Sequence, residues 1–355
     1  VDRITAIGEC VGDRGEPPDR DFCRYPAGVS RRGPVARRGP RRTARLSGAI
    51  PAAGPCRRTA TAGRQGRPAL ADHRVFFARG LRSHAPPTRR RQPCGDIMKV
   101  ELLPSCTGPA SESSGSPQFL SSYCVDEQVA IDAGAIGLVA DLQRQRQVRQ
   151  VFLTHGHLDH VASLPLFIEN VHAPGPDCPE VLATAEVLDS LRGDLLNGRT
   201  WPDFFQLSQP ASAFVTATAL EPGVAVERSG LSVTPLPVSH APGSVGFLVD
   251  DGHTRVAFPS DTGPTDAFWQ AAAAGPPPAA VFLETSFPDR LAGLAGETGH
   301  LWPAALPIEM AKLGRPTRWI IVHRKAAFAE EIRREIEALA LPGVEMVQPG
   351  FRYEF

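Results

Sequence analysis

One short segment contains four side chains of the kinds that bind metals. This segment restricts the fold of the chain more than any other sequence feature. The segment reads Thr154-His155-Gly156-His157-Leu158-Asp159-His160 and directly follows an apolar strand candidate. In an extended chain His155 and His157 point the same way. A turn after them brings Asp159 and His160 round from a second direction. Imidazole and carboxylate groups bind zinc and similar divalent ions, so the segment predicts a metal site at a strand end.

Three further side chains of ligand type each end an apolar strand candidate, as the first cluster does. They are His240, Asp261 and His323. Because one loop cannot complete two coordination shells, we expect these side chains to meet the first cluster in the folded protein. Together the two sets supply seven ligands, enough for two divalent ions. We interpret His172, at a helix end, and His253, in a hairpin turn, as structural residues.

Composition divides the chain near Met98. Residues 1–97 hold 21 Arg, no Lys and 8 Asp or Glu, a balance of +13, whereas residues 98–355 carry a balance of −13. The first segment is rich in Arg, Pro, Gly and Ala and shows no lasting helix or strand period, which predicts disorder. Three interpretations stay open: a disordered tail, GC-rich upstream DNA translated ahead of a start at Met98, and an arm that binds nucleic acid.

Several classes of protein are disfavoured by what the sequence lacks. No window approaches the roughly 18 consecutive apolar residues of a membrane-spanning helix. The N-terminus shows no apolar core followed by a small-residue cleavage site, so a secretory signal is not visible. Seven Cys with no Cys-x-x-Cys pair indicate reduced thiols rather than a disulfide framework. We therefore expect a cytoplasmic protein that has no membrane partner.

Residues 98–355 alternate apolar strand candidates with helical stretches, and we expect them to form one domain. The expected strands span residues 99–103, 128–132, 150–154, 231–236, 246–249, 254–258, 280–284, 318–322 and 344–347. Helices are expected at 326–339, at 137–147 and near 185–196. Strands followed by helices, in two batches, predict an α/β fold whose sheets are covered by helices on their outer faces.

The order of these motifs resembles the metallo-β-lactamase superfamily over essentially all of residues 98–355. The motifs are Asp132, the cluster at 155–160, His240, Asp261 and His323. This resemblance implies a four-layer αββα sandwich with two metals at the edge of its sheets. It implies that His155, His157 and His240 hold one metal. Asp159, His160 and His323 would hold the other, with Asp261 between them and Asp132 supporting the metal loop.

Four runs more closely resemble the class II 3′,5′-cyclic-nucleotide phosphodiesterases: 155–163, 197–204, 284–288 and 299–301. Residues 165–167 depart from that signature, so cAMP, cGMP and other phosphodiesters stay open as substrates. The resemblance implies two divalent ions, zinc in the first place, with manganese or iron also compatible. Hydroxide bound to them would attack the phosphorus of a cyclic nucleotide such as cAMP and give the 5′-monophosphate. Family members often form homodimers.

Beyond the ligand Asp159, the resemblance suggests that His300, oriented by Glu284, assists the departing 3′ oxygen. We also expect Trp201 and Phe204 to stack on the nucleobase. The alternatives are a tRNA 3′-processing endonuclease, another hydrolase of the superfamily, and a binding protein with a vestigial site. The balance of −13 over residues 98–355 disfavours an RNA partner, because RNA binding needs a basic surface.

Overall fold

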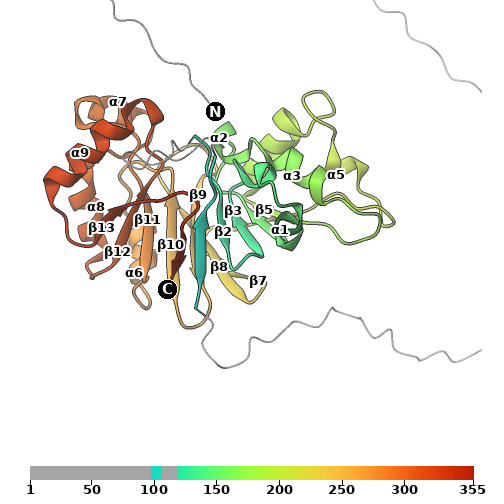
Figure 1. Ribbon diagram of the computed structural model, residues 1–355, viewed down its shortest axis with the longest axis horizontal. Coiled ribbons are helices and arrows are strands. Elements are labelled where there is room, and N and C mark those ends of the chain that lie inside the picture. Colours follow the sequence, from blue (N-terminus) through green and yellow to red (C-terminus); the bar gives the residue numbers. More distant parts are fainter. Residues whose placement is uncertain (1–96, 106–118) are drawn as a thin grey trace, which may run out of the picture. The chain divides into compact units, whose positions relative to one another are not determined.

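The structure, a computed structural model, describes residues 97–105 and 119–355 (Figure 1). Apart from Ile97, the segment predicted to be disordered lies outside these residues. Within them, no helix is both long enough and apolar enough to cross a lipid bilayer.

Two seven-stranded sheets dominate the described part of the chain. The strands of the first sheet are, in spatial order, β14 (Arg352–Glu354), β1 (Lys99–Leu102), β2 (Tyr123–Val125), β3 (Val129–Ile131), β4 (Gln150–Phe152), β5 (Glu180–Ala183) and β6 (Thr216–Ala219). Those of the second are β13 (Val344–Met346), β12 (Arg318–Val322), β11 (Ala280–Glu284), β10 (Arg255–Ser260), β9 (Val245–Asp250), β8 (Leu231–Pro237) and β7 (Val226–Arg228). Strands β3 to β6 run parallel, as do β10 to β13, because helices connect them.

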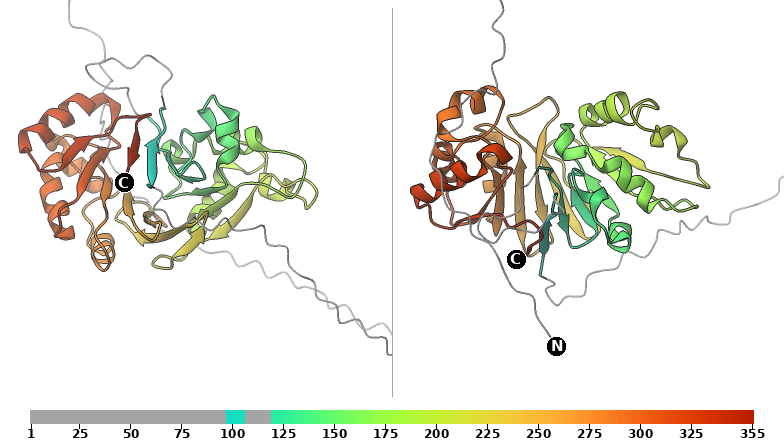
Figure 2. Two further views of the ribbon diagram at one scale, coloured as in Figure 1. Left: turned by 60° about the horizontal axis from the view of Figure 1, so that its bottom comes forward. Right: turned by 45° about the horizontal axis from the view of Figure 1, so that its top comes forward.

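Helices cover the outer face of each sheet (Figures 1 and 2). Those on the side of the first sheet are α1 (Leu142–Gln147), α2 (Leu158–Val161), α3 (Leu164–Val171), α4 (Ala185–Ser190) and α5 (Phe204–Leu207). Those on the side of the second are α6 (Ala267–Ala273), α7 (Ala292–Glu297), α8 (Leu306–Leu313) and α9 (Ala329–Leu339). This layering confirms the αββα sandwich that the sequence led us to expect.

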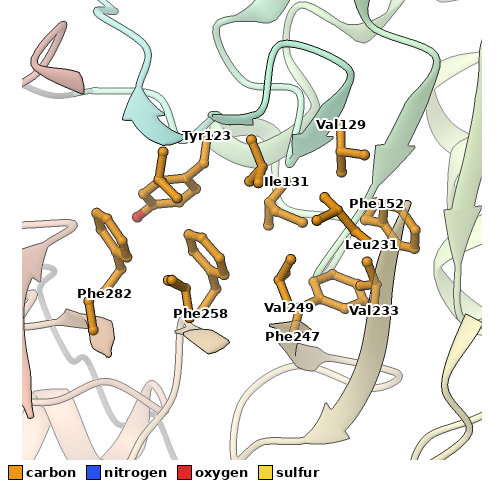
Figure 3. Packing of buried hydrophobic residues seen from close by; sticks show 14 of the residues in the cluster. Tyr123, Val129, Ile131, Phe152, Leu231, Val233, Phe247, Val249, Phe258 and Phe282 are labelled. Carbon is orange, nitrogen blue, oxygen red and sulfur yellow. The ribbon is translucent and has the colours of Figure 1, made fainter. Parts of the chain in front are cut away.

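The core lies between the sheets and continues beneath the helices. Along β11, Phe282 faces the opposite sheet, whereas Val281 and Leu283 face the helices. Across the sandwich, the Phe152 ring lies 5.6 Å from the Phe247 ring (Figure 3). Because both faces of these strands are buried, their sequences read as continuous apolar runs, which is why the sequence revealed them.

All nine expected strands are found, but five strands were not predicted: β2, β5, β6, β7 and β14. They are only three or four residues long, and β6 and β7 contain no fully buried residue. The helix expected over 137–147 begins only at Leu142, because the Asp141 side chain accepts hydrogen bonds from Gln143 N and Arg144 N and caps α1 there. The helix expected over 326–339 opens with a 3₁₀ turn, η5 (Ala326–Phe328).

Candidate metal centre

The seven side chains predicted as ligands lie at the carboxyl ends of strands in both sheets. In the first sheet they follow β4: His155 and His157, and then Asp159 and His160 in α2. In the second sheet they follow β8, β10 and β12 in turn: His240, Asp261 and His323. Parallel strands end at the same edge of a sheet, which is where open α/β sheets bind their ligands. The topology thus gathers residues that lie as far as 168 positions apart in the sequence.

The first group of candidate ligands is His155, His157, His240 and Asp261, whose ligand atoms all lie within 4.8 Å of one another. His240 Nε2 is 3.1 Å from His157 Nδ1. Asp261 Oδ2 is 3.8 Å from His155 Nε2 and 3.9 Å from His240 Nε2. Three ring nitrogens and one carboxylate oxygen therefore converge on one point.

The second group contains the same Asp261 together with Asp159, His160 and His323. His323 Nε2 is 3.4 Å from His160 Nε2 and 3.1 Å from Asp159 Oδ2. The other oxygen of Asp261, Oδ1, is 3.4 Å from His160 Nε2. Asp261 therefore turns one carboxylate oxygen toward each group.

These spacings fit divalent ions. A tetrahedral zinc ion with nitrogen ligands at about 2.0–2.1 Å sets those nitrogens about 3.3–3.4 Å apart. The measured separations of 3.1 Å for His157 and His240 and 3.4 Å for His160 and His323 lie close to that value. In addition, His155 Nε2 and Asp261 Oδ1 are buried and make no hydrogen bond within the described structure. Buried polar atoms without such partners are costly. An ion in the first group would satisfy His155 Nε2, and an ion in the second would satisfy Asp261 Oδ1.

Hydrogen bonds fix the orientation of two of the imidazole rings. His160 Nδ1 is 2.7 Å from Asp132 Oδ2, and His240 Nδ1 is 2.9 Å from the carbonyl oxygen of Gly299. A carbonyl or ionised carboxylate can only accept, so Nδ1 donates in both rings. In their neutral form, both rings direct the lone pair of Nε2 toward the centre, as metal-binding histidines do. Gly299 is required for this approach, since its φ is +68° and a Cβ would lie 3.1 Å from His240 Nδ1.

Hydroxyl groups contact the imidazole rings of His155 and His323. Thr154 Oγ1 is 3.0 Å from His155 Nδ1, and Ser286 Oγ is 2.9 Å from His323 Nδ1. Neither Ser286 nor Gly299 was predicted from the sequence to have a role. Both lie inside runs that resemble the phosphodiesterases, 284–288 and 299–301, which was the available signal.

Burial and charge pull the pKa values of this centre in opposite directions. Burial, assisted by the His160 charge, holds the pKa of His155 well below its usual value. Burial opposes the charge of His160 as well, but the carboxylates of Asp261 and Asp132 outweigh it and raise the His160 pKa. Burial likewise opposes the ionised form of Asp261, yet the charges of His323 and His160 lower its pKa. The centre is thus built around an ionised Asp261.

His300 and Glu284 form a pair beside the candidate ligands. Glu284 ends β11 and is fully buried, and its Oε1 is 2.8 Å from His300 Nδ1. The same oxygen accepts a hydrogen bond of 2.9 Å from Thr262 N. The His300 ring centroid lies 4.9 Å from that of His240 and 5.9 Å from that of His323. The pair therefore stands at the wall of the centre, with Nε2 of His300 as the nitrogen left free of Glu284.

The two aromatic residues expected to contact a base have different surroundings. Phe204 is only 2% exposed and stacks on Phe214, with ring centroids 5.1 Å apart, so it offers no open face to a ligand here. Trp201 is half-buried against the apolar cluster that contains Phe204. Its buried Nε1 has no hydrogen-bond partner within the described structure. His172, interpreted as structural, ends α3 and stacks on Phe214. His253, also interpreted as structural, is exposed in the connection between β9 and β10.

Similarity to known proteins agrees with this architecture. A probable 3′,5′-cyclic-nucleotide phosphodiesterase of Yersinia pestis is 25% identical over 241 residues, which are 59% of this chain and 68% of that protein. A 3′,5′-cyclic-nucleotide phosphodiesterase of Aliivibrio fischeri is 30% identical over 130 residues, 34% of this chain and 36% of that protein. The crystal structure of unliganded yeast PDE1 matches 73% of this chain and 99% of its own with a TM-score of 0.56 and 15% identity, which shows a shared fold.

A model of the Beta-lactamase superfamily domain matches residues 129–324. The match includes all seven candidate ligands and both strands from which the first cluster and Asp132 emerge. It covers more than half of the chain. The chain therefore belongs to the β-lactamase superfamily, and it is a metal-dependent hydrolase.

Proposed function

We propose that this protein is a phosphodiesterase that hydrolyses 3′,5′-cyclic nucleotides, cAMP among them, to 5′-monophosphates. The observation that carries the proposal is the paired centre, in which Asp261 directs one carboxylate oxygen to each ligand group. Two ions held there could bind two oxygens of one phosphodiester. The names of the Yersinia pestis and Aliivibrio fischeri relatives support cyclic nucleotides as the substrate class.

The residues that would hold the first ion are His155, His157 and His240. Those that would hold the second are Asp159, His160 and His323, and Asp261 would be shared. The imidazole-rich set suits zinc, and manganese and iron(II) also accept these ligands. When bound, such ions neutralise charge on phosphate oxygens and lower the pKa of a coordinated water.

The chain's own contribution to the reaction would come from His300. Hydrolysis adds water across the bond between phosphorus and the ribose 3′ oxygen, and that oxygen leaves with a proton. Because Glu284 accepts from Nδ1, the nitrogen that can deliver this proton is Nε2. The Glu284 carboxylate also stabilises the charged imidazolium before the transfer. Thr262 N fixes that carboxylate in turn, and Thr262 follows Asp261 directly, so one network positions both the acid and the shared ligand.

The test is turnover of 3′,5′-cAMP by the full chain loaded with zinc or manganese. We expect 5′-AMP as the product, and we expect Asp159→Ala to abolish its formation. Asp177→Ala is the matched control, because Asp177 is an exposed carboxylate remote from the candidate ligands. If the folded, metal-loaded protein leaves both cAMP and cGMP intact, the proposal is wrong.

A further inference from the structure

A serine with a strained backbone directly precedes the shared ligand Asp261. Ser260 ends β10 with φ +58°, in the left-handed region that favours glycine. Strain of this kind persists only where the surrounding structure requires it, and it gathers at functional sites. Two other non-glycine residues of the centre share this conformation, Asp132 with φ 62° and His323 with φ 50°. Because glycine would suit position 260 better, the serine there indicates a role for its hydroxyl.

The hydroxyl of Ser260 joins the second sheet to the loop that carries the first ligand cluster. Its Oγ donates to Thr154 Oγ1 at 2.9 Å, although the two residues lie 106 positions apart in the sequence. Thr154 directly precedes His155 and is fully buried. The hydrogen bond therefore connects the strand end from which Asp261 emerges to the residue at which the ligand cluster begins.

Thr154 in turn contacts both groups of candidate ligands. Its Oγ1 is 2.9 Å from each oxygen of the Asp132 carboxylate, and this carboxylate holds the His160 ring of the second group. The same Oγ1 is 3.0 Å from Nδ1 of His155 in the first group. One hydroxyl thus links ligands of both groups to the backbone that carries Asp261.

The directions of these hydrogen bonds follow from the available donors. An ionised carboxylate can only accept, so the single proton of Thr154 Oγ1 points to Asp132. The lone pairs of that oxygen then accept from Ser260 Oγ and from His155 Nδ1. With its proton on Nδ1, His155 directs the lone pair of Nε2 toward Asp261 Oδ2, 3.8 Å away. The network therefore fixes the tautomer in which His155 can bind an ion.

We propose that Ser260 is a positioning residue, which holds Asp261 in place for metal binding through its hydrogen bond to Thr154. The inference rests on the paired metal centre of the proposed function, and it needs no particular substrate. Without the hydroxyl, the end of β10 loses its link to the ligand loop, and Asp261 must be ordered by the ions themselves. Metal affinity then falls, because partners that orient metal ligands contribute about ten- to a hundredfold to it.

The test measures the zinc affinity of Ser260→Gly and Ser260→Ala in the full chain, by competition with a chromophoric chelator. We expect about ten- to a hundredfold weaker zinc binding in both variants, because both lack the hydroxyl. Glycine relieves the strain of a positive φ and alanine does not. The metal-free Ser260→Gly protein is therefore expected to melt at a higher temperature than metal-free Ser260→Ala, although the two bind zinc equally weakly.

This difference separates a positioning role from simple support of the fold. Unchanged zinc affinity in Ser260→Gly would overturn the proposal. So would zinc affinities that follow the melting temperatures of the two variants, since a residue that only supports the fold weakens binding through stability.

Ser229→Gly is the matched control. Ser229 also has a positive φ, 49°, and its hydroxyl donates to Gln150 Oε1 at 2.6 Å. Gln150 begins β4, whereas the ligand cluster follows the other end of that strand. We expect zinc affinity to stay unchanged in Ser229→Gly, and an equal fall in this variant would contradict a specific role for Ser260.

A double-mutant cycle tests the route through Thr154. Thr154→Val removes the hydroxyl at nearly constant shape, whereas Thr154→Ser keeps it, so Thr154→Ser is expected to retain most of the zinc affinity. In the Thr154→Val background, Ser260→Gly should have little further effect, because the hydrogen bond between the two residues is already lost. Fully additive losses would show that Ser260 does not act through Thr154, and the proposal would be wrong.

Zinc affinity is measured without substrate, which separates this inference from the proposed function. Zinc binding that depends on Ser260 in a protein that leaves cAMP intact would support the positioning role while overturning the phosphodiesterase proposal. Hydrolysis of cAMP by a protein whose zinc affinity is unaffected by Ser260→Gly would do the reverse.

Discussion

Asp132 and His160 form an ion pair in the interior of the protein, with 2.7 Å between Oδ2 and Nδ1 and almost no exposure of either side chain. The same carboxylate accepts a hydrogen bond of 2.8 Å from Thr154 N, through Oδ1. Asp132 adopts a left-handed backbone with φ 62°, which is unusual for a residue with a side chain. One strained, buried carboxylate thus fixes both ends of the loop that carries the candidate ligands, and strain of this kind commonly accompanies function.

Replacing Asp132 with Asn is expected to lower zinc affinity by about ten- to a hundredfold, because partners that orient a ligand histidine have effects of this size. An amide oxygen at position 132 can still accept from His160 Nδ1, but it carries no full negative charge. Competition with a chromophoric chelator measures the affinity. Asp177→Asn, on an exposed loop, serves as the control. Zinc binding as tight in Asp132→Asn as in the unchanged chain would show that the ion pair only supports the fold.

His300→Ala is expected to lower kcat for cAMP by about 10²- to 10⁴-fold, the usual effect of a general acid, while the zinc content stays the same. His253→Ala is the matched control, since His253 is exposed between β9 and β10. Zinc content is measured by elemental analysis on the same samples used for kinetics. Normal turnover by His300→Ala would exclude His300 as the acid.

Removing metal with a chelator is expected to destabilise the protein, because it leaves two buried ligand atoms, His155 Nε2 and Asp261 Oδ1, without a hydrogen-bond partner in the described structure. At a metal concentration a hundred times the Kd, the ion adds about 2.7 kcal/mol to the free energy of unfolding. Thermal unfolding with and without chelator measures this difference. In Asp261→Ala, which removes the shared carboxylate, the chelator should have much less effect. Identical melting of the unchanged chain in both conditions would contradict metal binding at this centre.

Gly134→Ala is expected to destabilise the protein by roughly 1–3 kcal/mol, as overpacking does, and to weaken metal binding. A Cβ at this position would collide with the carbonyl oxygen of Asp159 and lie 2.8 Å from Ser121 N. Both are backbone atoms, so neither can swing aside. Gly296→Ala is the control: a Cβ there meets nothing within 4 Å, and alanine favours a helix. Thermal unfolding and zinc titration of both variants measure these effects. Equal stability and equal zinc affinity in the two variants would show that a Cβ at position 134 causes no steric clash.

Glu180→Gln is expected to destabilise the protein by up to about 1 kcal/mol at pH 7, and by less at low pH. Arg228 Nε on β7 lies 2.7 Å from Glu180 Oε2 on β5, so this pair joins the two sheets at one edge. The Arg228 hydrogen bonds lower the pKa of Glu180, although burial opposes them. A lowered carboxyl pKa stabilises the fold above the usual glutamate pKa of about 4.3, and this stabilisation disappears as the pH falls through the folded value.

Urea unfolding of Glu180→Gln and of the unchanged chain measures the difference in their free energies of unfolding. It is carried out at pH 7 and near pH 3, with excess chelator in every sample. Glu221→Gln, an exposed glutamate in a turn, is the control. A difference in unfolding free energy that does not shrink at low pH would show that the carboxylate charge plays no part.

Strand β11, which the sequence predicted, and strand β7, which it did not, differ in burial. Val281, Phe282 and Leu283 are buried on both faces of β11, so this strand is apolar throughout and visible in one sequence. Strand β7, by contrast, contains no fully buried residue, and its place is set by pairing with β8 and by the Arg228–Glu180 ion pair. Local patterns carry no record of such distant partners, so edge strands of this kind emerge only in the folded chain.

By itself, the sequence determined that ligand-type side chains close buried strands, because apolar runs and the residues that end them are local features. The division of those ligands into two groups was implied by the family resemblance and not by the local pattern of residues. It depends on distances that the tertiary structure sets, such as the 3.4 Å between His160 and His323. Charge acts through space, and only the fold sets which charges face one another.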